Sequence, residues 1–404
     1  MNIQTQAGSQ LDFGRWQESL RRPIPALDGV RGLAILAVLA HQLILDHSNV
    51  SPWVRRLLAV PEVGWVGVQL FFVLSGFLIT GILLETRDAT NRWSSFFARR
   101  ALRIFPPYYL LLTVLFCVLP RLVTLPPEFS AGLGRQSWYW LYLANWASLA
   151  GGGVSALAPC WSLSVEEQFY LLWPPLVFAV RQRTVVLGAT VAVGAALATR
   201  TWIVLAGKNL EYAYEFTVAR MDALVIGALT AILVRNRAAL ATGLGFIRRW
   251  GYVVPALLVV AGAFSGGYSR RNPVTMTVGH TVLAIASAYL ILLAVRDNAR
   301  ASGWIGKALG WSPFRMFGKH SYAIYLFHHP LDMALDRLFL TRMVAPLNQW
   351  QYIAVQTAYF VLGAVLLLML AMLFHIGFER PILNLKRHFR AQRPNFRRLA
   401  GRAG

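Results

Sequence analysis

An arginine and a histidine stand ten residues apart in the first long apolar segment of the chain, Arg31 and His41. At about 1.5 Å of rise per helical residue, the imidazole would lie roughly 15 Å deeper than the guanidinium, near the middle of a hydrocarbon layer about 30 Å thick. A histidine there could act as a general base, because imidazole titrates close to neutral pH. The alternative is a neutral histidine bonded to a neighbouring helix, with Arg31 extending to the lipid headgroups.

Two more histidines, His328 and His329, lie about as deep from the same side in a later apolar segment. Asp332 follows His328 by four residues and Tyr325 precedes it by three, so these three side chains share one face of a helix. We therefore expect a His328–Asp332 pair and a functional His328, and we interpret His329 as structural.

Membrane-spanning helices must position these residues. The 404-residue chain is 56% hydrophobic and only 14% charged, which leaves too little polar surface for an ordinary soluble domain. We predict an all-α, polytopic transmembrane helix bundle with about ten spanning helices and no separate soluble domain. The expected spans are 29–46, 64–84, 104–123, 166–182, 184–206, 216–234, 250–265, 277–295, 318–339 and 352–378.

The net charge of +22 invites a nucleic-acid partner, but the positive-inside rule explains better where the cations stand. With a cytoplasmic N-terminus, the inside segments carry runs of arginine and the outside loops carry only pairs. We therefore expect no nucleic acid, both termini in the cytoplasm, and a location in the cytoplasmic (inner) membrane. Cys117 and Cys160 form neither a disulfide framework nor a metal-ligand pattern, so no metal is expected.

No loop is long enough to be a catalytic domain, so the chemistry must take place in the membrane. The longest loop, 124–165, is rich in Trp and Tyr, which favours an interfacial aromatic belt over stacking on sugar rings. We divide the chain into a cytoplasmic N-terminal segment (1–25), a membrane domain (26–381) and a basic cytoplasmic tail (382–404) that meets anionic lipid.

Seven strings run through almost the entire chain in this order: LDGVRGLAILAVLAH from residue 27, GVQLFFVLSGFLIT at 67–80, ARRALRIFPPYY at 98–109, CWSLSVEEQFYLLWP at 160–174, ARMDALVIGALTAIL at 219–233, GKHSYAIYLFHHPL at 318–331 and FERP at 378–381. Together they resemble the acyltransferase 3 family, multi-spanning enzymes that O-acylate cell-envelope glycans and some natural products. The resemblance implies an integral-membrane O-acyltransferase of the type that acetylates O-antigen and exopolysaccharide.

One spacing departs from the family pattern. The family usually places its histidine one residue farther from the arginine, and here Gln42 occupies that position. One residue turns a side chain by about 100° around a helix. Either the helix adjusts, or a different face carries the base.

The resemblance implies a cytoplasmic acyl-CoA donor and a glycan acceptor on the other face of the membrane. Acyl transfer to a hydroxyl needs a base for its proton and stabilisation of the oxyanion. His41 is the preferred base, and Arg31 is assigned to the donor. Acyl-CoA, taken as acetyl-CoA, is a co-substrate, and no permanently bound cofactor is expected. The arginines expected to bind the CoA phosphates, unless they only follow the positive-inside rule, are Arg99, Arg100 and Arg103.

Two adjacent carboxylates, Glu166 and Glu167, are assigned with His328 to the catalytic set on the acceptor side. Ser164 followed three residues later by Glu167 has the pattern of a capping box at a helix start. That would account for Glu167 and leave Glu166 free to orient a histidine or bind acceptor hydroxyls.

The remaining polar residues of the spans complete the expected pocket. Asp222 could instead form a structural ion pair with Arg220, and Ser75 beside Gly76 suits close helix packing better than a nucleophile. The residues assigned to the acceptor side or pocket are Asp28, Ser75, Trp161, Asp222, Tyr322 and Tyr325.

We predict a membrane O-acyltransferase that acts on a glycan of the envelope or an exported glycan. A proton-coupled transporter or flippase, with His41, Asp222 and His328 as a relay, is the alternative from another class. The arginine run before Pro106 and Pro107 favours the enzyme, because a relay does not require it. Acylation of a small secondary metabolite and a non-catalytic family member also remain open.

Overall fold

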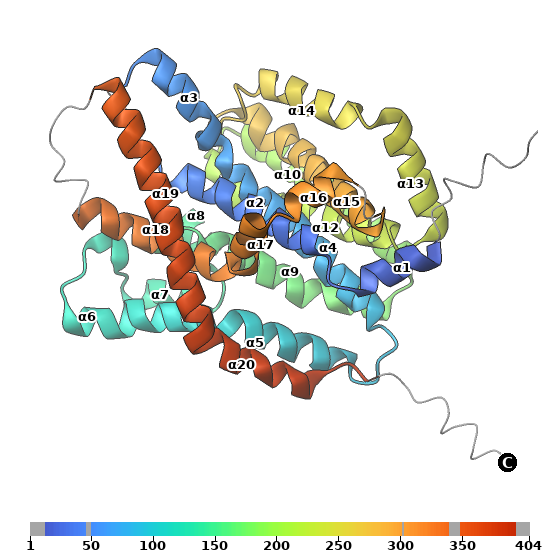
Figure 1. The fold of residues 1–404 in the computed structure, drawn as a ribbon. Coiled ribbons are helices and arrows are strands. Elements are labelled where there is room, and N and C mark those ends of the chain that lie inside the picture. The colour runs from blue at the N-terminus through green and yellow to red at the C-terminus, as the bar shows by residue number, and fades with distance from the viewer. Residues whose placement is uncertain (1–12, 46–49, 301–302, 339–347, 393–404) are drawn as a thin grey trace, which may run out of the picture.

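The computed structural model describes residues 13–45, 50–300, 303–338 and 348–392, and every regular element in these ranges is a helix. The predicted all-α bundle is therefore confirmed (Figure 1). The α-helices are α1 (Phe13–Arg21), α2 (Pro25–Gln42), α3 (Pro52–Glu62), α4 (Val66–Glu85), α5 (Arg92–Thr113), α6 (Leu119–Leu122), α7 (Leu133–Trp140), α8 (Ala144–Leu149), α9 (Cys160–Ala179), α10 (Gln182–Leu205), α11 (Leu210–Glu215), α12 (Thr217–Leu233), α13 (Arg237–Trp250), α14 (Val253–Phe264), α15 (His280–Arg300), α16 (Trp304–Leu309), α17 (Ser312–Lys319), α18 (Ser321–Leu338), α19 (Gln349–Phe374) and α20 (Arg380–Asn384). Short 3₁₀ or π segments are η2 (Val63–Trp65), η3 (Val114–Val118), η4 (Pro127–Phe129), η5 (Ser155–Leu157), η6 (Thr275–Gly279), η8 (His375–Glu379) and η9 (Leu385–Phe389).

Six helical stretches among the described residues are long and apolar enough to cross a membrane, so the protein is a multi-pass membrane protein. Each of the ten apolar ranges predicted from hydropathy coincides with a helix, and four of these helices, α2, α9, α14 and α18, are not among the six. The count of ten spans stays a prediction. The six stretches are Pro52–Glu85, Arg92–Leu122, Gln182–Leu205, Leu210–Leu233, Thr275–Ala299 and Gln349–Phe389.

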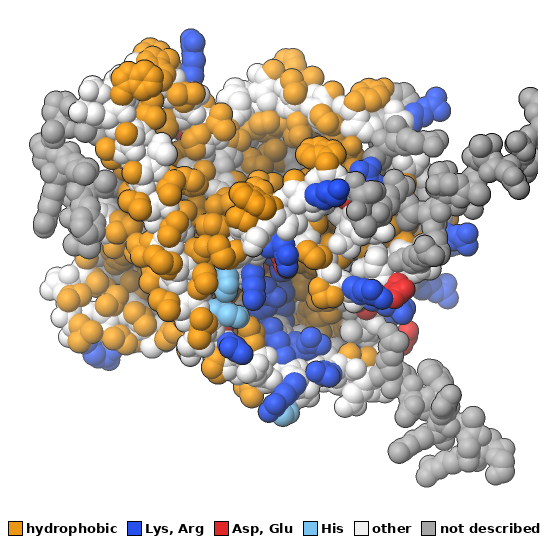
Figure 2. Space-filling model, viewed as in Figure 1, with side chains coloured by type: hydrophobic (Ala, Val, Ile, Leu, Met, Phe, Trp, Pro, Cys, Tyr) orange, Lys and Arg blue, Asp and Glu red, His pale blue; other side chains and the backbone are white. Residues whose placement is uncertain are grey.

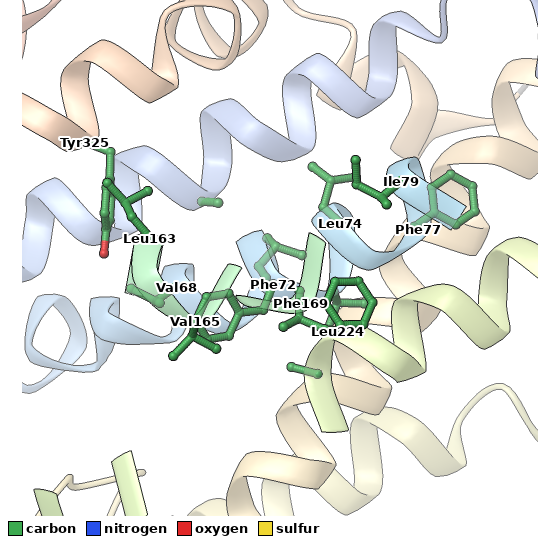
Figure 3. Packing of buried hydrophobic residues seen from close by; sticks show 14 of the residues in the cluster. Val68, Phe72, Leu74, Phe77, Ile79, Leu163, Val165, Phe169, Leu224 and Tyr325 are labelled. Atoms are coloured by element: carbon green, nitrogen blue, oxygen red, sulfur yellow. The ribbon is translucent and has the colours of Figure 1, made fainter. Parts of the chain in front are cut away.

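Helix α4 packs against α2, α9, α12 and α15. Its crossing with α12 depends on glycine, because a Cβ at Gly76 would lie 1.8 Å from the carbonyl oxygen of Leu224, and one at Gly227 would lie 1.9 Å from that of Val73. Small residues let membrane helices approach closely enough for van der Waals contact between their backbones. Around this crossing, apolar side chains of α4, α9 and α12 form part of the buried core (Figure 3).

A fully buried ion pair joins α10 to α12. Arg200 donates to Asp222 over 2.8 Å, and neither side chain is exposed. Thr281 of α15 and the main-chain N–H of Ala223 also donate to the Asp222 carboxylate, over 2.8 and 2.9 Å. The predicted ion pair of Asp222 with Arg220 is therefore wrong, because Arg200 of a neighbouring helix binds the carboxylate.

Arg220 is fully buried as well, and it contacts the Nδ1 atom of His280. Its guanidinium lies 5.2 to 5.6 Å from the centroids of three aromatic rings, those of Phe72, Trp161 and Tyr214. Such rings attract a buried cation through their negative faces. Trp161, assigned to the acceptor pocket from the sequence, therefore packs around Arg220.

Candidate active site

Five helices, α2, α4, α5, α9 and α18, surround one polar cavity with about 760 Å³ of unoccupied space, part of which is open to solvent. A concave site with a few convergent polar groups is typical of small-molecule binding. Eight of the residues assigned to the site from the sequence line this cavity together: Arg31, Ser75, Arg100, Arg103, Glu166, Glu167, Tyr322 and Tyr325.

Three arginines form the basic side of the cavity: Arg31 from α2, and Arg100 and Arg103 from α5. The last two are three residues apart and so share a face of α5. Arg31 forms an ion pair of 3.5 Å with Asp28, one turn earlier on α2. The Nε atom of Arg100 is buried without a hydrogen-bond partner among the described residues. Three guanidinium groups brought together in this way favour an anionic ligand.

Hydroxyl groups and carboxylates also line the cavity. Tyr170 donates to Glu166 over 3.1 Å and is hydrogen-bonded to Ser75 of α4. The ring of Tyr170 also lies under the Arg100 guanidinium, at 4.0 Å from the centroid. Tyr170 therefore links the acidic and basic sides of the cavity. Sequence reasoning missed this tyrosine, although it follows Glu166 by four residues on the same helix face.

The capping-box interpretation of Glu167 is wrong. Helix α9 begins at Cys160, so Ser164 lies inside the first turns instead of preceding them. Its hydroxyl donates to the carbonyl of Cys160 and accepts from the N–H of Ala144, both over 3.1 Å. Glu167 therefore has no role in a cap, and its side chain lines the cavity beside Glu166.

Two tyrosines of α18 close the cavity and fix this helix against its neighbours. Tyr322 donates to the main-chain carbonyl of Ile104 in α5 over 2.8 Å. The hydroxyl of Tyr325 is hydrogen-bonded to that of Ser162 in α9 over 2.6 Å. Both tyrosines were assigned to the pocket from the sequence, and Ser162 was not.

His328 lies directly behind Tyr325, is almost fully buried, and is not part of the cavity lining. Its Nδ1 atom is 2.7 Å from the carbonyl oxygen of Tyr325. A carbonyl can only accept, so Nδ1 carries the proton and Nε2 is the acceptor of the neutral ring. The expected His328–Asp332 pair is wrong, because the Asp332 carboxylate accepts from Gln42 and from Tyr359, each over 2.7 Å.

His41 is half-buried near the end of α2 and does not line the cavity. Its Nδ1 atom is buried without a hydrogen-bond partner among the described residues, and both His328 and Arg270 lie within electrostatic range of it. Gln42, the residue at the family's usual histidine position, points elsewhere and binds Asp332. The shifted spacing therefore places His41 on a different face of α2 from Gln42.

The other assigned residues lie outside the cavity lining in the part of the chain that the structure describes. Asp28 is beside Arg31 at the start of α2. Asp222 and Trp161 belong to the buried groups around Arg200 and Arg220. Arg99 is exposed and lines a separate basic hollow with residues of η9.

The fold and the cavity define a multi-pass helical membrane protein with a site lined by arginines and glutamates. The family model described as an acyltransferase domain matches residues 24–375. Peptidoglycan O-acetyltransferase OatA of Listeria monocytogenes is 30% identical over 374 residues, which are 85% of this chain and 54% of that protein. The putative peptidoglycan O-acetyltransferase YrhL of Bacillus subtilis is 29% identical and covers 77% of this chain and 49% of its own length. No solved structure matches.

Because the family match extends over most of its length, this chain belongs to the acyltransferase 3 family. The resemblance drawn from the seven strings is thus confirmed. The chain spans about half the length of the relatives that it matches.

Proposed function

We propose that this chain is a membrane O-acetyltransferase that transfers an acetyl group from acetyl-CoA to a hydroxyl of a cell-wall glycan. The observation that carries the proposal is the cavity in which Arg31, Arg100 and Arg103 face Glu166 and its hydroxyl partners. The names of the relatives, two peptidoglycan O-acetyltransferases, support a glycan acceptor and acetyl as the acyl group.

The three arginines are the donor side of the proposed site. Guanidinium groups bind phosphate oxygens in pairs of charge-assisted hydrogen bonds, and CoA carries several phosphates next to its thioester arm. The unpartnered Nε atom of Arg100 is one donor available for such a ligand. The same cations would stabilise negative charge on the thioester oxygen when the acceptor attacks.

His41 is the proposed general base. Its Nδ1 atom, which has no hydrogen-bond partner among the described residues, would take the proton of the acceptor hydroxyl while the new carbon–oxygen bond forms and the carbon–sulfur bond of the thioester breaks. The proton would then pass to the departing thiolate, which leaves as CoA. We assign His328 a positioning role, since its Nδ1 atom is committed to the Tyr325 carbonyl and Tyr325 closes the cavity.

The orientation in the membrane follows from the same proposal. The arginine runs predicted to lie inside include Arg99, Arg100 and Arg103, so the basic side of the cavity would open to cytoplasmic acetyl-CoA. The N- and C-termini would then be cytoplasmic and the protein would lie in the cytoplasmic membrane, with the acceptor on the other face.

One observation weakens the transporter hypothesis. A relay through His41, Asp222 and His328 requires a carboxylate that exchanges protons, but Asp222 is engaged by Arg200, Thr281 and the Ala223 N–H. We therefore keep the acyltransferase as the proposed function.

The proposal is tested with membrane vesicles that contain the protein, acetyl-labelled acetyl-CoA and a glycan extract of the host. We expect base-labile label on glycan with the wild type, and loss of that label with Arg100→Gln at equal expression. Label that never appears on glycan or any other hydroxyl acceptor would refute the O-acetyltransferase. Label that persists at the wild-type rate in Arg100→Gln would refute the assigned donor side.

A further inference from the structure

The segment that follows α20 folds back onto the start of α5, in contrast to a freely solvated tail. Asn91 donates to the main-chain carbonyl of Arg390 over 2.9 Å and accepts from the N–H of Gln392 over 2.8 Å. Ser95 donates to the carbonyl of Phe389, also over 2.9 Å. These bonds use the backbone of the returning segment, so the side chains of Lys386 and Arg390 take no part in them.

Four cations gather where this segment meets α5. Arg99 of α5 and Lys386, Arg387 and Arg390 of the returning segment line one hollow with Leu383, Asn384 and Ala391. None of the four forms an ion pair with a described carboxylate. Like charges held together without counter-ions attract an anion and concentrate it at the surface. Below the centre of Figure 2, Lys and Arg side chains gather over α5 and α20.

The one acidic side chain that acts on Lys386 among the described residues does not neutralise the cluster. Glu379 lies within electrostatic range of Lys386, but its carboxylate is bonded to Nδ1 of His375 over 2.8 Å. Lys386 is half-buried and within range of three arginines of α5. The cluster therefore has an excess of positive charge that its own surroundings leave unpaired.

This hollow adjoins the basic side of the cavity. Arg99 and Arg103 are one helical turn apart on α5, with Arg103 in the cavity lining and Arg99 in the hollow. Lys386 lies within electrostatic range of both. A long ligand with its reacting end in the cavity and anionic groups at its other end would fit both regions at once.

We propose that Arg99, Lys386, Arg387 and Arg390 form a second anion site, which binds the 3′-phosphate at the adenosine end of CoA. The inference rests on the proposed function, in which CoA is the donor. In CoA the 3′-phosphate lies at the opposite end from the thioester, and the pyrophosphate lies between them. Arg100 and Arg103 would bind the pyrophosphate, and the second anion site would bind the terminal phosphomonoester. Phosphate headgroups of lipids share this chemistry, so the test separates the two sources.

The experiment measures equilibrium binding of CoA and of 3′-dephospho-CoA to the purified full-length chain in lipid nanodiscs. The test variant is Lys386→Gln with Arg390→Gln, whose side chains take no part in the backbone bonds to Asn91. The matched control removes two exposed arginines from the same predicted side of the membrane, Arg181→Gln with Arg183→Gln. A third variant, Lys386→Arg, keeps the charge. Each is compared in zwitterionic nanodiscs and in nanodiscs that contain phosphatidylglycerol.

We expect the wild type to bind CoA about tenfold more tightly than 3′-dephospho-CoA, which is the effect of one charge-assisted contact. The double variant should lose this preference in both lipids, while the control pair and Lys386→Arg keep it. A double variant that keeps the preference would overturn the second anion site. An effect seen only with phosphatidylglycerol would overturn it too, in favour of lipid headgroups. A wild type that binds neither compound would overturn the CoA donor itself, a different failure.

Discussion

Two buried polar regions of this bundle differ in how their charges are balanced. In the contact of α10, α12 and α15, the Asp222 carboxylate is matched by Arg200 and accepts two further hydrogen bonds. In the cavity between α2, α4, α5, α9 and α18, three arginines converge and the Nε atom of Arg100 has no partner among the described residues. Buried charge is costly in a membrane protein unless it is paired. The Arg200–Asp222 pair therefore holds helices together, and we propose that a ligand completes the second region.

The largest expected effect concerns catalysis by buried groups that lack a hydrogen-bond partner among the described residues. His41 lies outside the lining of the cavity, and its Nδ1 atom is buried without a hydrogen-bond partner among the described residues. We expect His41→Ala to lower the rate of acetyl transfer by about 10²–10⁴-fold, the usual contribution of a positioned base, with unchanged expression and melting temperature. Label transfer in vesicles measures the rate. A variant with full activity would show that another group takes the proton, and His328→Ala would then be the next variant to assay.

The next largest expected effect is on the stability of the region around the Arg200–Asp222 ion pair. Asp222→Asn leaves Arg200 as a buried charge without a counter-ion, which should cost about 3–5 kcal/mol in the free energy of unfolding. Thermal unfolding of the purified protein measures the loss. Arg100→Gln is the matched variant in the cavity and should leave the melting temperature unchanged or raise it. If both variants were equally destabilised, the two regions would not differ in the way described above.

Close packing beside the paired region gives a smaller effect. Gly76→Ala would place a methyl group 1.8 Å from the Leu224 carbonyl oxygen, so α4 and α12 must move apart. Overpacking of this kind costs about 1–3 kcal/mol, seen as a lower melting temperature. Gly134→Ala is a control, because a Cβ there has open space. A Gly76→Ala variant as stable as the control would mean that the crossing of α4 and α12 is looser than the structure has it.

Glu166→Gln should have the smallest effect on stability. The amide oxygen can still accept the Tyr170 hydrogen bond, so we expect the free energy of unfolding to change by less than about 1 kcal/mol. If Glu166 only orients its partners, the transfer rate should fall by less than tenfold. A fall of about 10²-fold or more would instead indicate that its carboxylate moves a proton.

Much of the fold and part of the site could be predicted from the sequence. Each apolar range coincides with a helix, because a run of apolar residues in lipid must satisfy its backbone internally. The strings that contain Arg31, Arg100, Glu166 and Tyr322 each contribute a helix to one cavity. Features that depend on the spacing of residues within one helix could thus largely be predicted from the sequence.

Contacts between helices were harder to predict. Arg220 is the cation nearest to Asp222 in sequence, but Arg200 of α10 reaches it, and no periodicity reveals that partner. Ser164 and Glu167 have the spacing of a capping box, but α9 starts earlier, at Cys160. Asp332 shares a helix face with His328, but Gln42 of α2 binds it. In the first and third cases a side chain from another helix displaced the local partner, and in the second the helix began earlier than the motif indicated.

The most direct test of the central claim is the binding of acetyl-CoA to the purified protein and to Arg100→Gln, measured by calorimetry in the same nanodiscs. The account predicts that the wild type binds and that Arg100→Gln binds at least tenfold more weakly, the loss of one charge-assisted phosphate contact, with its melting temperature in the absence of ligand unchanged or raised. Equal affinity of the two proteins would contradict the claim that the arginines of the cavity form the donor site.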